Sequence, residues 1–549
     1  MIFPRWMPSS VNRKTLKFLA AWGFLNLLMT AGFSGLNPHW ATFALPSGEI
    51  ILLLAVAAAA ARSGVACHPG WHVPAITLLL FLRLFTLADL LSPQFLNRPF
   101  NLALDAAFLP DLVHLLYNSV PRGTFFGGIF LLIALVLLLI VAIHGSLAVV
   151  TGFLRLPQQR RLFWVLAALA LLVMIGMQHV SSAAPAAVRP FGSLRRLAEE
   201  IRFVLNMDAY RRDILGDLQQ AGQPSGDPAG TVAGLNNTDI YLFLIESYGR
   251  TAFAKPGHFE LFEPVLRRVQ RDLSAAGFAI ASNFVTSPTF GGMSWLAHAS
   301  AVSGLRIDSP LAYRLLLTST VRTVVHRFNA AGYRTVCAMP GTVQPWPEGS
   351  FFGYHRIYTQ PSFGYHGPVF DWSPMPDQLA VDVVRRREMN DRRRPLFISF
   401  VLGSSHAPFR TLPPYLQDWS RLGDGSVFGR LAPITFPVTW SDMSDAEEAY
   451  IAALTYVLKV VAGFLENFVR DDALIVIMGD HQPNAQVTGP QASWSVPVHI
   501  LSRNPALLEP LGRHRYSPGL IPAQPPPHDG MERVLATLLA ADGLAADSK

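Results

Sequence analysis

Three strongly apolar segments after residue 238 of the sequence are each followed by residues that can do acid–base or metal chemistry. DIYLFLI is followed by Glu246, ALIVIMG by Asp480 and His481, and LFISFVL by a short turn that contains His406. A charge at the end of a buried strand is unfavourable unless it is paired or bound to a cation. Each residue alone is more typical of a strand-end cap or a surface charge, but together they indicate a metal site. Carboxylates combined with imidazoles favour Zn²⁺ or Mn²⁺ over Ca²⁺, which prefers oxygen ligands.

The segment from 238 to about 505 alternates between strand-like and helix-like runs, and this pattern must position the chemical residues. The strand-like runs are 239–245, 277–281, 333–338, 396–402, 473–478 and 496–501. The helix-like runs include 258–275, 317–331, 376–388 and 445–469. Continuous apolar strands that alternate with amphipathic helices predict a parallel sheet covered on both faces. Ligands of such sheets bind at the carboxyl ends of the strands, where the acidic residues and histidines are expected.

The first 180 residues are apolar enough to form membrane spans. The 549-residue chain has 51% hydrophobic and only 15% charged residues, whereas an average soluble domain carries roughly 25% charged residues. This composition excludes a single water-soluble domain and a disordered chain. A span needs about 20 mainly apolar residues, and five spans are predicted over 15–34, 48–62, 74–92, 124–152 and 162–179. A signal peptide can mimic the first, but four more follow it and no small-residue cleavage site stands out.

Basic residues near the predicted spans indicate how the chain is oriented. They precede the first span, follow the second, and lie between the fourth and the fifth, at Arg5, Arg13, Lys14, Lys17, Arg62, Arg155, Arg160 and Arg161. With five spans they all fall on one side, which is cytoplasmic by the positive-inside rule. We therefore expect a multi-pass protein of the bacterial plasma membrane, with a cytoplasmic N-terminus and everything after about residue 180 outside. The net charge of +7 reflects this pattern rather than nucleic-acid binding.

Composition also divides the chain into segments. We expect a transmembrane anchor over 1–180, a linker over 181–237, an exported domain over 238–505 and a C-terminal tail over 506–549. Within the linker, residues 193–220 place apolar side chains at helical spacing with arginines on the other face. This amphipathic helix either packs on the exported domain or lies on the anionic membrane surface. Cys67 and Cys337 fall on opposite sides of the membrane, so the exported domain is expected to lack a disulfide.

Four motifs carry a family resemblance, in the order DIYLFLIESYGR, SPTFGGMSWLAHASAVSGL, SFVLGSSHAPF and IVIMGDHQP. Together they resemble the alkaline phosphatase/sulfatase superfamily, and most closely its membrane-bound branch of lipoteichoic acid synthases and phosphoethanolamine or phosphoglycerol transferases. The resemblance covers about 238–505. It implies an α-helical transmembrane bundle of five spans followed by an α/β/α sandwich domain. It also implies one divalent metal, Mn²⁺ or Zn²⁺, with Mg²⁺ as a further option.

The resemblance assigns roles to the residues that match the motifs. Glu246, Asp480 and His481 match the metal ligands of the family. The family nucleophile opens a helix in a Gly-rich turn and also contacts the metal, which matches Ser294; most members use Thr, and Thr289 is the reserve candidate. A metal-bound hydroxyl loses its proton near neutral pH and can attack phosphorus, and the first turn of a helix offers unpaired N–H groups to phosphate oxygens. The alternative for Ser294 is an ordinary helix cap.

Further residues match the surroundings of the family site. His406 resembles the histidine that contacts the transferred phosphate or protonates the leaving group, with a structural strand-end histidine as the alternative. Arg356, in FFGYHRIY, is a candidate phosphate or head-group contact, and His355 and Trp346 are further candidates for substrate binding. His298 lies one helical turn after the nucleophile and either faces the site or packs in the core.

These expectations together predict a metal-dependent phosphotransferase. It would move a phosphoglycerol or phosphoethanolamine group from a membrane phospholipid to an envelope glycan or lipid-linked acceptor through a covalent Ser294 intermediate. A phosphodiesterase or phosphatase would use the same residues with water as acceptor. A sulfuric ester hydrolase is disfavoured, because neither Ser294 nor Cys337 has the following Pro and Arg that formylglycine formation needs. A catalytically inactive head-group-binding scaffold gains nothing from an activated hydroxyl, and a transporter would need more charges in the spans.

Overall fold

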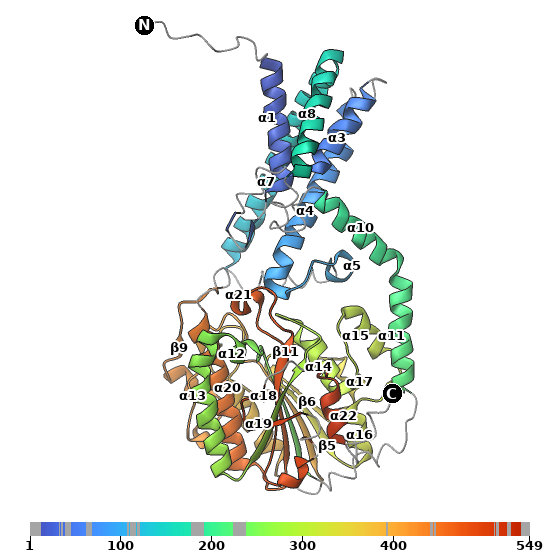
Figure 1. Ribbon diagram of the computed structural model, residues 1–549. Coiled ribbons are helices and arrows are strands. Elements are labelled where there is room, and N and C mark those ends of the chain that lie inside the picture. The colour runs from blue at the N-terminus through green and yellow to red at the C-terminus, as the bar shows by residue number, and fades with distance from the viewer. Residues whose placement is uncertain are drawn as a thin grey trace. The chain divides into compact units, whose positions relative to one another are not determined.

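The computed structural model of the protein contains two compact units, both drawn in Figure 1. The structure describes residues 13–31, 33–34, 37–38, 46–61, 69–106, 109, 113, 117, 121–176, 191–222, 238–390, 394–439, 443, 446–509, 511, 515–523 and 529–539. The first unit comprises Met1–Pro93 and Arg98–Met207, and the second comprises Gln94–Asn97 and Asp208–Lys549. The chain thus passes to the second unit for good at Asp208, and the short segment Gln94–Asn97 also belongs to the second unit. Cys67, Arg5 and Arg62 lie outside the described residues.

The first unit is helical. Its mainly apolar helices, called the longer helices below although α3 is short, are α1 (Arg13–Thr30), α3 (Gly48–Ala60), α4 (His72–Leu96), α7 (Arg122–Leu154) and α8 (Pro157–Gly176). Its other elements are β1 (Phe33–Ser34), β2 (Asn37–Pro38), η2 (Pro69–Trp71), α5 (Leu102–Asp105) and α10 (Gly192–Leu205). Each longer helix coincides with a predicted span to within a few residues. Large apolar side chains such as Phe130, Leu138 and Val141 of α7 are exposed, as expected of a surface that faces lipid.

Three of these helices, α4, α7 and α8, are long and apolar enough to cross a bilayer. The protein is therefore a multi-pass membrane protein. Helix α1 carries Arg13, Lys14 and Lys17 in its first turns, and α3 has only 13 residues, so the number of five spans stays a prediction. One further helix of sufficient length and hydropathy, α20 (Glu447–Phe468), belongs to the second unit and is mostly buried there.

The first three helices of this unit alternate in direction, as consecutive spans must. The backbone N–H of Ser47, which caps the start of α3, donates to the side chain of Asn26 near the end of α1. The Arg83 guanidinium in α4 donates to the carbonyl oxygen of Ala31, just after α1. The end of α1 and the start of α3 thus lie together, and α4 runs back towards them.

The second unit is built around an eight-stranded sheet with the order β12-β4-β11-β10-β3-β7-β5-β6. The strands are β3 (Ile240–Ile245), β4 (Ala279–Thr286), β5 (Arg334–Met339), β6 (Arg356–Thr359), β7 (Leu396–Leu402), β10 (Leu474–Gly479), β11 (Ser495–Ser502) and β12 (Ser517–Pro518). The five strands β10, β3, β7, β5 and β6 are parallel. In contrast, β11 is antiparallel to β10, β4 to β11, and β12 to β4.

Helices cover both faces of this sheet and give the three-layer α/β/α arrangement that the sequence predicts (Figure 1). The central strand β3 divides its side chains between two cores: Tyr241 and Phe243 face one, and Leu242 and Leu244 face the other. The first core includes α13 (Pro256–Ala275), α19 (Asp377–Glu388) and α20. The second includes α14 (Ser294–Ser303), α15 (Pro310–Leu317), α16 (Val324–Ala330) and α22 (Arg533–Leu539). The remaining described elements are α11 (Met207–Gly222), α12 (Thr251–Ala254), α17 (Gly349–Phe352), α18 (Gln360–Phe363), α21 (Ala485–Thr488), β8 (Thr411–Leu412), β9 (Ile434–Thr435), η6 (Trp419–Arg421), η7 (Ser426–Arg430) and η8 (Pro505–Leu507).

The sheet differs from the prediction in being mixed rather than wholly parallel. Between β10 and β11 the chain forms only the four-residue helix α21, which is too short to cross the sheet, so β11 returns antiparallel. Within the predicted helix 317–331, only α16 (Val324–Ala330) and Leu317, the last residue of α15, are helical. Strands β6 and β12 were not predicted, because four and two residues are too few to show an apolar pattern. β12 pairs with β4 from within the predicted C-terminal tail.

Candidate active site

Glu246 and the Asp480–His481 pair lie side by side because the strands before them are neighbours. Strands β3 and β10 are parallel, and Ile245 is opposite Gly479 in their register. The next residue of each strand therefore emerges at the same edge of the sheet. All three residues are buried, and one ligand atom from each lies within 4.8 Å of the others. The structure thus brings together the strand-end residues that the sequence singles out.

Ser294 lies directly against this cluster. Its Oγ donates to Glu246 Oε2 at 2.9 Å and lies 3.0 Å from His481 Nε2. The same imidazole nitrogen is 3.1 Å from Glu246 Oε1. The other ring nitrogen, His481 Nδ1, is 2.6 Å from the carbonyl oxygen of Gln482, which fixes the ring with Nε2 towards the serine. The hydroxyl therefore contacts two of the three candidate metal ligands.

The turn before α14 presents Ser294 to the cluster. Gly291 has a φ of 68° and Met293 a φ of 57°, both in the left-handed region. Glycine adopts this conformation freely, whereas for Met293 it is strained. Ser294 is the first residue of α14, and no described side chain caps this helix end. The backbone N–H of Leu296 in this first turn donates to the carbonyl oxygen of Met293 at 2.9 Å, and the positive end of the helix dipole lies at Ser294, where it favours an anion such as phosphate.

Asp480 is held through both of its carboxylate oxygens. Its Oδ1 accepts from the backbone N–H of Ser247 at 2.9 Å and from its neighbour His481 at 2.6 Å. Its Oδ2 is 3.3 Å from Nε2 of His298, one helical turn after Ser294. Of the two alternatives for His298, the structure favours the one that faces the site. Its contact with a candidate metal ligand restrains the carboxylate, as outer-shell partners do in metal sites.

The electrostatics of the cluster fit a bound cation. Burial raises the pKa of Asp480, and the charge of Glu246 raises it further. Burial opposes ionisation of Glu246 too, but the charge and hydrogen bond of His481 outweigh it and hold the pKa of Glu246 below its usual range. For His481 burial lowers the pKa, but the charges of Asp480 and Glu246 raise it to about 9. Two buried carboxylates thus hold a positive charge, and the mixed oxygen and nitrogen donors suit Zn²⁺ or Mn²⁺.

His406 follows β7, the other neighbour of β3, and lies at the same sheet edge. Its charge contributes to the low pKa of Glu246. The imidazole stacks on the Trp372 ring with a centroid distance of 4.8 Å, and its Nδ1 is 2.6 Å from the carbonyl oxygen of Ala407. The turn before it is fixed by the buried Asp377, whose carboxylate accepts from two backbone N–H groups of the turn at 2.9 and 3.0 Å.

The structure does not bring Arg356 to this cluster. Arg356 is the first residue of β6, and its register runs through Val336 and Ile398 to Tyr241, near the start of the parallel strands. Glu246 follows the end of β3, roughly 16 Å further along at about 3.3 Å per residue. The guanidinium lies instead over the ring of Tyr358. A contact between Arg356 and a phosphate at the cluster is therefore not supported by this placement.

Two other candidates have structural partners away from the cluster, and the hydroxyl of a third does not contact it. His355 Nδ1 is 2.8 Å from Oγ1 of Thr335, near the start of β5. Trp346 stacks on Phe352 with a centroid distance of 5.3 Å. The Thr289 hydroxyl is buried, and no contact between it and the cluster is found among the described residues. Between the two candidate nucleophiles, the geometry favours Ser294.

Further residues, which the sequence did not indicate, hold the backbone of the cluster through hydrogen bonds to its carbonyl oxygens. Ser405 Oγ donates to the carbonyl oxygen of Glu246, and Ser287 Oγ to that of Asp480, each at 2.6 Å. Both serines follow strands of the same sheet, which is a signal that strand-end analysis can use. The hydroxyl of Tyr450 donates to the carbonyl oxygen of Ser247 at 2.9 Å. Tyr450 comes from α20, and nothing local in the sequence indicates this contact.

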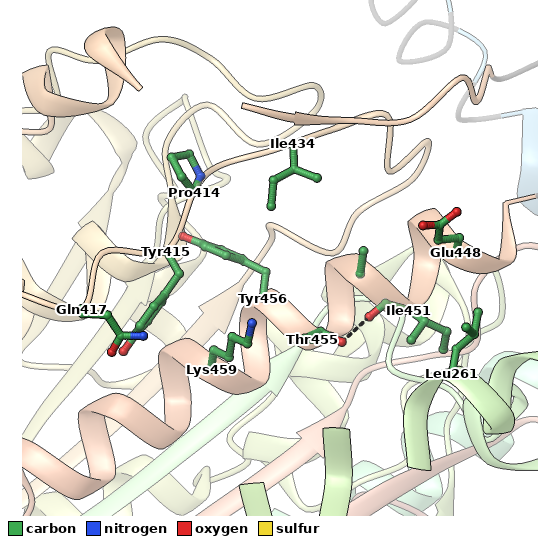
Figure 2. A pocket seen from close by; sticks show the side chains of 11 residues that line it. Leu261, Pro414, Tyr415, Gln417, Ile434, Glu448, Ile451, Thr455, Tyr456 and Lys459 are labelled. Atoms are coloured by element: carbon green, nitrogen blue, oxygen red, sulfur yellow. Dashed lines mark hydrogen bonds between the residues drawn. The ribbon is translucent and has the colours of Figure 1, made fainter. Parts of the chain in front are cut away.

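Figure 2 shows a pocket elsewhere on the same unit, with a volume of about 490 Å³. Its lining comes from α13, α20, β9 and the loop after β8, and includes Tyr415, Tyr456 and Lys459. None of the predicted site residues lines it. The candidate active site is therefore the group of Glu246, Asp480, His481 and Ser294, and not this pocket.

Comparison with known proteins supports the resemblance. Residues 300–504 match the Sulfatase family. The match begins within α14, just after Ser294, and includes His406, Asp480 and His481. The resemblance to the alkaline phosphatase/sulfatase superfamily is thereby supported over residues 300–504 of the second unit.

Several solved structures are similar to the chain. The lipoteichoic acid synthase LtaP from Listeria monocytogenes is 15% identical, with 61% of this chain and 79% of that chain covered and a TM-score of 0.38. The Streptococcus pyogenes phosphoglycerol transferase GacH, solved with sn-glycerol-1-phosphate, is 12% identical over 54% and 75% of the two chains, with a TM-score of 0.33. An alkaline phosphatase superfamily protein from Vibrio parahaemolyticus is 14% identical over 60% and 75%, with a TM-score of 0.34. No curated protein sequence matches the chain significantly.

Proposed function

We propose that this protein is a metal-dependent phosphotransferase that moves a phosphoglycerol or phosphoethanolamine group from a membrane phospholipid to a glycan or lipid-linked acceptor. The observation that carries the proposal is the contact of Ser294 Oγ with Glu246 and His481 in a buried cluster suited to a divalent metal. The sulfatase-superfamily domain supports an ester-transfer reaction. The apolar helices of the first unit support a lipid substrate, because attachment to the same bilayer raises its effective concentration.

Glu246, Asp480 and His481 would hold one Mn²⁺ or Zn²⁺ ion, beside Ser294. When bound, the ion lowers the pKa of the serine hydroxyl and offsets charge on the phosphate. The fixed His481 ring and the backbone donors to Asp480 orient these side chains before substrate arrives. Such preorganisation is the main contribution a protein makes to this kind of site.

In the first step, the deprotonated Ser294 Oγ attacks the phosphorus of the lipid head group. The bond between phosphorus and the diacylglycerol oxygen breaks, and His406 gives that oxygen a proton. The head group stays on Ser294 as a phosphodiester, and diacylglycerol returns to the bilayer. The positive end of the α14 dipole, at Ser294, stabilises the charge on the non-bridging phosphate oxygens during this step.

In the second step, a hydroxyl of the acceptor attacks the same phosphorus. His406, now neutral, takes the proton of that hydroxyl, and the bond between phosphorus and Ser294 Oγ breaks. The acceptor leaves with the head group, and Ser294 and His406 return to their starting protonation states. We place this reaction outside the cytoplasm of a bacterial plasma membrane, in line with the positive-inside distribution of Arg and Lys.

The test uses the full chain in lipid nanodiscs with Mn²⁺ or Zn²⁺ and fluorescent phosphatidylglycerol or phosphatidylethanolamine. We expect metal-dependent diacylglycerol release from one lipid, lost in Ser294→Ala and kept in Thr289→Ala. Release of the head group into water without any acceptor requirement would show a hydrolase instead. Bound metal with no release from either lipid would contradict the proposed donor.

A further inference from the structure

Helix α10 is fixed to the first unit by a buried polar network at its start. The backbone N–H of Ser193 donates to Glu49 Oε1 at 3.1 Å, and the Ser193 hydroxyl is 2.9 Å from Thr86 Oγ1 of α4. One turn on, Arg196 pairs with the buried Asp89 of α4 at 3.1 Å. The first turns of α10 are therefore part of the helical unit rather than a loose connector.

The apolar face of α10 begins inside this unit and continues beyond it. Leu194 and Leu197 pack against the core formed by the longer helices. Ile201, Val204 and Leu205 continue the same face at helical spacing, but they are exposed, by 52%, 54% and 78% respectively. A soluble helix does not leave three neighbouring large apolar side chains uncovered without a partner.

The charged side chains of α10 indicate which partner covers this face. Arg195 and Arg202 are exposed and lie together on one side of α10, between the apolar face and Glu199, and Arg195 pairs with Glu199 at 3.9 Å. Long basic side chains beside an apolar stripe are typical of helices that lie at a membrane surface, where they reach lipid phosphates. The apolar face is also continuous with the core of a unit whose helices are apolar enough to span the bilayer.

We propose that α10 lies in the membrane interface, with Ile201, Val204 and Leu205 inserted among acyl chains and with Arg195 and Arg202 at the phosphates of anionic phospholipids. This decides between the two alternatives that the sequence leaves open for the linker helix. The contacts of Ser193 and Arg196 hold the start of α10 beside the C-terminal part of α4. The inference does not depend on the reaction at Ser294 and holds for any activity of the second unit.

The experiment measures how deeply single nitroxide labels on α10 lie in the bilayer. The full chain, with Cys67→Ser and Cys337→Ala, carries Leu205→Cys or the matched control Glu199→Cys, and is placed in phosphatidylglycerol nanodiscs. Collisions with oxygen report apolar surroundings, and collisions with a water-soluble nickel chelate report water. We expect the oxygen-to-nickel collision ratio to be severalfold higher at position 205 than at position 199.

A second pair of measurements tests the contact with phosphate. Replacing phosphatidylglycerol with phosphatidylcholine should lower the ratio at position 205, and Arg195→Gln with Arg202→Gln should remove this dependence on lipid charge. Equal nickel access at both positions would place α10 in water and overturn the proposal. A label at position 205 that neither reagent reaches would also overturn it, because protein rather than lipid would then cover the face.

Discussion

The two units each contain a buried polar cluster, and the two clusters are balanced by different cations. In the first unit, Arg196 lies 3.1 Å from Asp89 and 3.6 Å from Glu200. In the second, the positive partner of Glu246 is His481. A guanidinium keeps its charge at any physiological pH, whereas an imidazole can release its proton and become a metal ligand. The ion pairs of Arg196 in the first cluster therefore persist at any physiological pH. In the second cluster, a metal ion can replace the proton of His481.

Glu246 also differs from the carboxylates of the first cluster in the donors that hold it. Asp89 accepts from the backbone N–H of Phe100, and Glu200 from that of Leu102. Glu246 instead accepts from side-chain hydroxyls, those of Ser247 and Ser294. Backbone donors move only when the chain unfolds locally, but a serine hydroxyl can rotate towards a substrate. Burial of charge alone thus does not identify a reactive site; exchangeable partners do.

The largest expected effect comes from removing the exchangeable hydroxyl. Ser294→Ala should lower turnover by on the order of a thousandfold or more, because the nucleophile is lost, while thermal stability stays close to that of the native protein. Ser294→Thr should keep part of the activity, since it keeps the hydroxyl. Lipid turnover and a melting curve on the same preparations check this. Full turnover in Ser294→Ala would mean that the Ser294 hydroxyl does not make the second cluster reactive.

Removing Arg196 from the cluster of the first unit should lower the unfolding free energy of that unit and leave metal binding unchanged. Arg196→Met leaves Asp89 and Glu200 buried without their cation, which should cost on the order of 3 kcal/mol of unfolding free energy in the first unit. The metal affinity of the full chain should not change. Thermal unfolding in nanodiscs and metal titration measure the two quantities separately. A loss of metal affinity with unchanged stability is the contrary result.

His499 sharpens the comparison because it is a buried imidazole with hydroxyl partners. Its ring nitrogens lie 2.7 Å from Ser282 Oγ and 2.9 Å from the Tyr248 hydroxyl, and burial lowers its pKa to about 3. Between that value and about 6.5, the unfolded chain binds a proton at this position and the folded chain does not, so stability falls as the pH is lowered. The loss should reach about 2 kcal/mol at pH 5.

In His499→Gln, the dependence of unfolding free energy on pH between 6.5 and 4.5 should be shallower by one proton. Denaturant unfolding of the full chain at several pH values gives this slope, whatever the absolute stability of the variant. An unchanged slope would mean that His499 takes up a proton in the folded protein.

The smallest expected effect concerns the residue that restrains a candidate ligand. His298→Ala should weaken metal binding by about tenfold, as loss of an outer-shell partner commonly does. His298→Gln keeps a donor near Asp480 Oδ2 and should recover part of the affinity. Calorimetric titration of both variants separates this role from simple packing, which would lower stability without changing affinity.

The sequence predicts those residues of the site that follow the carboxyl ends of apolar strands. Glu246 and Asp480 come directly after long apolar strands, His406 lies in the short turn after another, and parallel neighbours must bring such ends to one edge. The placement of Arg356 could not be predicted in this way. It begins the four-residue edge strand β6, and only long-range pairing with β5 fixes which end of the sheet it occupies. The direction of β11 likewise depends on the absence of a crossover helix.

In the linker too, the helical pattern of α10 can be predicted from neighbouring residues, but its contacts with distant residues cannot. The amphipathic pattern of α10 follows from helical spacing and is visible in the sequence. Its attachment through Ser193 and Arg196 depends on Glu49, Thr86 and Asp89, which are far away in the chain. A single sequence gives no sign of these pairings.

The most direct test of the proposed reaction is to trap the covalent intermediate. The full chain in nanodiscs, with metal and donor phospholipid but no acceptor, is quenched in acid, digested and analysed by tandem mass spectrometry. The account predicts a head-group phosphodiester on Ser294 that disappears in Ser294→Ala and when acceptor is added. An adduct on Thr289 or elsewhere, or continued lipid turnover without any adduct, would contradict it.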